Sequence, residues 1–88
     1  MPEFELLAAR GQLLLLGFLN TELEIAQHML QLAELTTSAE HRQGLVQDVG
    51  TALDTVRNLS IRLENPDSRS RIRNRTEELE TEFSRLIG

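Results

Sequence analysis

Apolar residues recur every three to four positions along three stretches of this 88-residue chain. At that period the side chains return to one face of an α-helix. Residues that commonly begin helices separate the stretches, Thr37 at the first junction and Asn65 with Pro66 at the second. Because the connections are short, neighbouring helices should be antiparallel. The pattern predicts an all-α fold, a three-helix up-down-up bundle that forms one domain over residues 1–88.

The first helix is expected over residues 4–35, and its apolar residues form two sets. One set forms a heptad-spaced seam of Phe4, Phe18, Ile25 and Leu32, with Leu7, Leu14 and Leu35 on the neighbouring row. The other set lies further round the helix and contains Leu16, Leu23 and Leu30. Since apolar residues cover well over half of the circumference, this helix should be buried on more than one side.

The second and third helices each show one narrow apolar stripe. The second is expected over residues 38–64, where Thr37 and Glu40 have the spacing of a capping box. The third is expected over residues 66–86, with Asn65 as its N-cap and Pro66 in its first turn. The third stripe is displaced by one residue from the second, which favours two helices over one long helix kinked at the proline.

Two narrow stripes do not cover the wide apolar arc of the first helix. A chain this short buries a modest fraction of its surface and gains from a partner. A second copy, related by a two-fold axis, is the simplest partner, and a helix of another protein is the alternative. We therefore predict a homodimer formed through the first helix, with an interface that includes Leu16, Leu19, Leu23 and Leu30.

Composition argues against several functions. The chain has no cysteine, which removes disulfides, thiolate zinc sites and cysteine nucleophiles. Its net charge of -5 disfavours nucleic-acid binding. The apolar run of residues 13–19 is far shorter than the roughly 20 residues of a membrane span and lacks the flanks of a secretion signal, so we expect a cytoplasmic protein with no membrane contact. Enzyme motifs are absent, and no catalysis, cofactor, metal or small-molecule substrate is expected.

Two histidines are candidates for chemistry. His28 shares a row with Leu14 and Leu35, and a phosphotransfer role for it, as in histidine phosphotransfer domains, is the alternative function. Mostly apolar residues follow it, which favours a core or interface-edge histidine hydrogen-bonded to a polar neighbour. Neither His28 nor His41 has a glutamate three residues before it, as the histidines of di-metal bundles have.

A cluster of arginines opens the third helix. Side chains at every second position of a helix spread around its axis, so they form a collar and not a single row. We favour a solvated face with Arg73 paired to Glu77 and Arg75 paired to Glu78. Contact with an anion, an acidic partner or nucleic acid is the alternative. The collar consists of Arg69, Arg71, Arg73 and Arg75.

These observations together predict a small, non-enzymatic adaptor or regulatory module. It acts by helix-to-helix packing, either with itself or with a helix of a partner protein. The wide apolar arc of the first helix is the feature on which this prediction depends.

Overall fold

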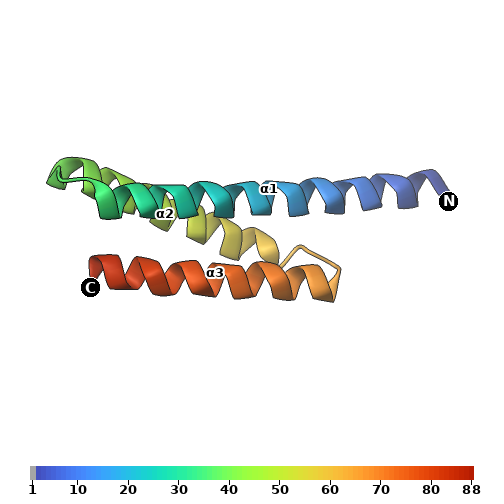
Figure 1. The fold of residues 1–88 in the computed structure, drawn as a ribbon. Coiled ribbons are helices and arrows are strands. Elements are labelled where there is room, and N and C mark those ends of the chain that lie inside the picture. The colour runs from blue at the N-terminus through green and yellow to red at the C-terminus, as the bar shows by residue number, and fades with distance from the viewer. Residues whose placement is uncertain (1) are drawn as a thin grey trace.

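Three α-helices make up the structure, a computed structural model that describes residues 2–88, with the side chains of residues 2 and 4 left out. They are α1 (Pro2–Leu35), α2 (Ala39–Ser60) and α3 (Pro66–Ile87), and this part of the chain contains no strand. In Figure 1, α2 returns from the end of α1 at an inclination, and α3 then runs beside both helices. The all-α prediction is confirmed, and α2 and α3 are two helices, not one kinked helix.

The start of α2 differs from the sequence prediction. Ser38 is the N-cap, and its hydroxyl accepts a hydrogen bond from the backbone N–H of His41 at 3.2 Å. The capping box of Thr37 and Glu40 is therefore wrong by one residue. Serine and threonine cap helices almost equally well, so the run of three hydroxyl residues at 36–38 did not identify the cap by itself.

The end of α2 also differs, because the helix stops at Ser60 and not at residue 64. Two hydrogen bonds between residues three apart, as in a 3₁₀ turn, end the helix. They run from the N–H of Arg62 to the carbonyl of Leu59 and from the N–H of Leu63 to the carbonyl of Ser60. Leu63 still enters the core at 2% exposure. The N-cap of α3 is Asn65, as predicted, with its side chain accepting from the N–H of Ser68 at 3.0 Å.

The core lies between one face of α1 and the stripes of the two shorter helices. Thr76 is the buried polar residue of this core, and its hydroxyl donates to the carbonyl of Ile72 at 2.6 Å. The hydroxyl is thereby satisfied within α3 and costs the core little. The buried apolar residues of the cluster are Leu19, Leu23, Ala26 and Leu30 of α1, Val49, Ala52, Leu53 and Val56 of α2, Leu63 of the connection, and Ile72 and Leu79 of α3.

Polar side chains fasten α1 to its neighbours at two places. At one end, Arg42 donates to the carbonyls of Ala33 and Thr36 at 3.2 and 3.1 Å, which satisfies acceptors at the end of α1. At the other, the amide of Gln12 donates to the carbonyl of Arg62 at 3.1 Å and accepts from the N–H of Glu64 at 2.9 Å. These two side chains hold α1 and α2 in a fixed alignment.

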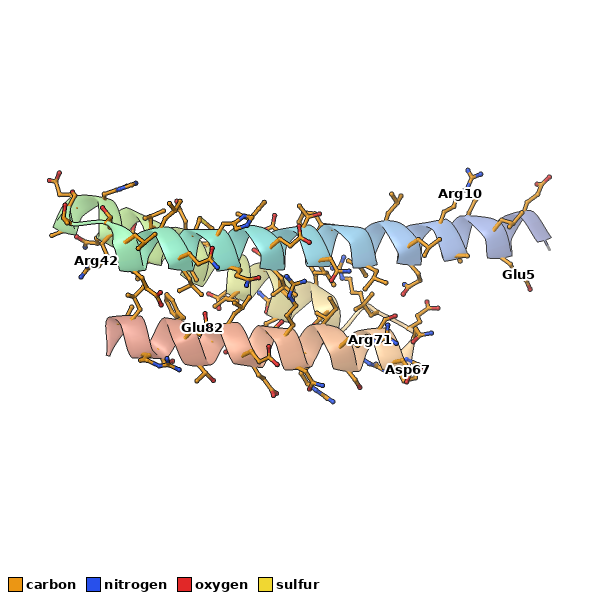
Figure 2. The ribbon with its side chains drawn as sticks, viewed as in Figure 1. Glu5, Arg10, Arg42, Asp67, Arg71 and Glu82 are labelled. Carbon is orange, nitrogen blue, oxygen red and sulfur yellow. The ribbon has the colours of Figure 1, made fainter. Side chains whose placement is uncertain are left out.

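The first part of α1 projects beyond the other helices. Its 34 residues span about 51 Å, whereas the 22 residues of α2 or α3 span about 33 Å. Figure 2 shows Glu5 and Arg10 on this projecting part, beyond the ends of α2 and α3. Residue 3 and residues 5–11 are all exposed, so little of this segment is covered by the other helices.

Candidate interaction surface

Exposed apolar side chains form a row along α1. Leu7, Leu14 and Leu35 are 65, 75 and 79% exposed, and Phe18, Ile25 and Leu32 are 45, 44 and 51% exposed. Exposed apolar side chains aligned along one side of a helix mark a candidate interaction site. We call it the outer row, and its members, three and four residues apart, are Leu7, Gly11, Leu14, Phe18, Thr21, Ile25, His28, Leu32 and Leu35. The same spacing would include Phe4, but its side chain is outside the part that the structure describes.

The residues predicted to contact a second copy lie on the other face of α1. Leu19, Leu23 and Leu30 are at most 1% exposed and belong to the core of this same chain, and Leu16 packs against that core. At about 100° per residue, Ile25 points about 160° away from Leu23. For Leu19, Leu23 and Leu30 the predicted interface therefore needs correction, because these three side chains have no surface left for a partner, whereas Leu16 is only partly buried. The structure leaves part of the apolar arc uncovered, but on the outer row.

A signal in the sequence distinguishes these two faces. No polar residue interrupts the inner face between residues 16 and 33, whose members are Leu16, Leu19, Leu23, Ala26, Leu30 and Ala33. The outer row contains Thr21 and His28. Since a polar group buried without a partner is costly, the uninterrupted face belongs in the core of the chain. Counting apolar residues alone misses this difference.

The polar members of the outer row are both exposed. Thr21 donates its hydroxyl to the carbonyl of Gly17 at 3.0 Å, so its polar atom is satisfied within α1. His28 was expected to hydrogen-bond to a polar neighbour, but its side chain makes no hydrogen bond or ion pair with any described residue. His28 is thus a surface histidine with apolar neighbours along its row, and the phosphotransfer hypothesis stays an untested prediction.

Two glycines on the open side of α1 meet nothing within the chain. A Cβ added at Gly11 or Gly17 would have no described atom within 4 Å beyond its chain neighbours and the backbone of its own helix. At Gly50 of α2, in contrast, a Cβ would lie 3.5 Å from Cζ of Phe83 in α3. Each glycine inside a helix costs about 1 kcal/mol relative to alanine. The packing of this chain gives no reason for that cost at Gly11 and Gly17.

The arginine collar is divided between two sides of α3. Arg71 and Arg75 line an open depression with Leu16 and Asn20 of α1, whereas Arg73 lines another together with residues of α2. Arg69 is exposed. The predicted pairs Arg73–Glu77 and Arg75–Glu78 are wrong, because the ion pairs among residues 2–88 join Arg57 to Asp54 at 3.4 Å and Arg57 to Glu80. The collar therefore does not gather its charge into one patch.

Other chemistry has few candidates in the described part of the chain. His41 lies at the start of α2, where its Nδ1 is 3.3 Å from the hydroxyl of Thr36. No group of three or more histidine, aspartate or glutamate side chains within residues 2–88 is arranged to hold a metal ion. None of the three described helices is long and apolar enough to cross a membrane.

Comparison with protein-family models, with curated proteins and with solved structures finds no match to this chain.

Proposed function

We propose that this chain is a small, non-enzymatic interaction module that acts by helix-to-helix packing. In this proposal, the up-down-up bundle is a support that holds α1 straight and presents its outer row to α1 of a second copy. The observation that carries the proposal is the exposed outer row, which continues from Leu7 to Leu35 on the side of α1 opposite to the core. Spacings of three and four residues are those of helices that pack in coiled coils.

The outer row supplies somewhat less than half of the area that a stable interface buries. A leucine side chain carries on the order of 100 Å² of apolar surface, since its full burial is worth about 2.5 kcal/mol at about 25 cal/mol per Å². The six apolar members are 44 to 79% exposed and so offer roughly 350 Å² per chain. A stable interface buries about 800 Å² per partner, and flanking side chains commonly supply the polar remainder.

The test is the mass of the chain in solution at micromolar concentration, measured by analytical ultracentrifugation. We expect wild type to sediment with twice the mass of one chain, and Leu14→Glu or Phe18→Glu to sediment as monomers. A charged side chain in the middle of an apolar contact would be buried without a partner, which is strongly unfavourable. Both positions are exposed in the single chain, so circular dichroism should show unchanged helix content.

The matched control is Gln47→Glu, which adds the same charge at an exposed position of α2. We expect it to keep the wild-type mass. A monomeric wild type, or an unchanged mass in both outer-row variants, would contradict the proposal. Leu23→Glu is unsuitable for this test, because Leu23 is fully buried and the charge would unfold the bundle.

A further inference from the structure

The outer row is complementary to itself when two copies of α1 run in opposite directions. We infer that the partner is a second copy of this chain, packed through antiparallel α1 helices in one defined register. This inference rests on the proposed function and adds the direction and register in which the two copies pack. In the register, Leu14 lies opposite Ile25 of the second copy, and Leu7 lies opposite its Leu32.

Side-chain sizes match in this register. The smallest member of the row, Gly11, lies opposite His28 of the second copy. The largest, Phe18, lies opposite Thr21, whose hydroxyl is already satisfied by the carbonyl of Gly17. Protein interiors are closely packed, so an interface in which each small residue meets a large one leaves neither voids nor clashes. The remaining described pairs all join two aliphatic residues of similar size.

Other arrangements match these residues less well. In a parallel pair each residue meets its own copy, so that two Gly11 leave a void and two Phe18 crowd one another. An antiparallel shift by one heptad in one direction places Gly11 opposite Thr21 and Leu14 opposite Phe18. The opposite shift leaves Leu7 without a partner. The register with Leu14 opposite Ile25 is the one that gives every outer-row residue from Leu7 to Leu32 a partner and fills the contact evenly.

The same register accounts for two features that the single chain leaves unexplained. Gly11, which has open space where its Cβ would be, receives the imidazole of the second copy. The projecting part of α1, exposed over residues 5–11, is covered by the far end of the second α1. The contact between described residues extends about 38 Å, from Leu7 to Leu32. Exposed Arg10, Glu24 and Gln31 then lie along its rim, where polar residues are usual.

Cysteine cross-linking tests the register, because the chain has no cysteine of its own. Leu14→Cys and Ile25→Cys variants, one carrying an affinity tag, are oxidised separately and as an equilibrated mixture. We expect a covalent dimer mainly in the mixture, since a disulfide needs Cα atoms about 4.4 to 6.8 Å apart. In the antiparallel pair, position 14 of one copy would lie about 16 Å along the axis from position 14 of the other, so the single variants should cross-link poorly.

The outcomes separate this inference from the proposed function. Efficient cross-linking of Leu14→Cys with itself would mean a parallel pair and would overturn the inference, while an outer-row dimer would still stand. A dimeric wild type with no cross-link in any sample would also overturn the register alone. A wild type that sediments as a monomer would overturn both.

A size exchange provides a second test. Gly11→Leu should raise the dissociation constant of the dimer by about tenfold or more, because the added side chain collides with His28 of the second copy. Adding His28→Ala in the same chain should recover most of the lost affinity. In a parallel pair these positions are 17 residues, or about 25 Å, apart and cannot compensate one another. Failure of the double variant to recover affinity would overturn the register.

Discussion

The two apolar faces of α1 are both rich in leucine, but one is buried in the core and the other is exposed to solvent. Leu19, Leu23 and Leu30 are buried by α2 and α3, whereas Leu14, Phe18 and Ile25 are exposed on the other side of the same helix. Both faces carry the heptad spacing of a packed helix. The difference lies in the residues between the leucines, alanine on the inner face and glycine, threonine and histidine on the outer row. Apolar spacing therefore indicates that a face packs, but not whether it packs within the chain.

Alanine substitutions on the two faces should have very different effects on stability. Leu23→Ala should lower the free energy of unfolding by about 2 to 5 kcal/mol, because it leaves a cavity in the core. Ile25→Ala, two residues away but 44% exposed, should lower it by about 1 kcal/mol or less. Urea unfolding followed by circular dichroism, at a concentration low enough to keep the chains apart, measures both. Equal losses would mean that the two faces are not distinct.

The attachment of α1 to the connection between α2 and α3 should depend on Gln12. Its amide makes two hydrogen bonds to the backbone of the connection between α2 and α3. Gln12→Ala should lower the free energy of unfolding by about 1 to 3 kcal/mol, since each of the two bonds contributes about 0.5 to 1.5 kcal/mol. Gln31→Ala, at an exposed site on the same helix, is the control and should change little. Equal effects would show that this connection does not depend on the amide.

Most of the fold could be predicted from the sequence, because it follows from local chemistry. The stripe of Ile72, Thr76 and Leu79 is buried as its spacing predicts, and Asn65 with Pro66 starts α3. Helix ends were less certain, because Ser38 competes with Thr37 as a cap and the chain leaves α2 before Leu63 enters the core. The first difference is a choice between neighbouring hydroxyl residues, and only the second depends on tertiary contacts that residue spacing does not contain.

The sequence predicts that α1 has more apolar surface than its two neighbours cover, but it does not identify which face stays exposed. The excess apolar surface of α1 follows from counting residues, but the choice between its two faces depends on which one meets α2 and α3. Hydrogen bonds of Gln12 and Arg42 help to fix this choice. The bond of Gln12 joins residues far apart in the sequence, and the bond of Arg42 caps the end of another helix. No sequence motif marks either bond. The polar interruptions at Thr21 and His28 were the signal that could have decided it.

Two glycine substitutions should give the smallest effects and the finest comparison. Gly11→Ala on the outer row and Gly44→Ala on α2 both add a methyl group where no described atom lies within 4 Å. Each should raise the free energy of unfolding of the separate chain by up to about 1 kcal/mol. Sedimentation should then distinguish them, with weaker self-association for Gly11→Ala and unchanged association for Gly44→Ala. Equal association constants would show that Gly11 is not in a tight contact.

The projecting part of α1 has a consequence for how partner binding can be observed. Helices shorter than about 12 to 15 residues are only marginally stable in water. Residues 5–11 are exposed and precede Gln12, whose amide bonds to the connection between α2 and α3. Their backbone amides should therefore exchange hydrogen with solvent quickly, while those near Leu23 exchange only when the bundle opens. Any partner that covers Leu7 and Gly11 would slow that fast exchange. The exchange rate of these amides therefore shows whether a partner is bound to this part of α1.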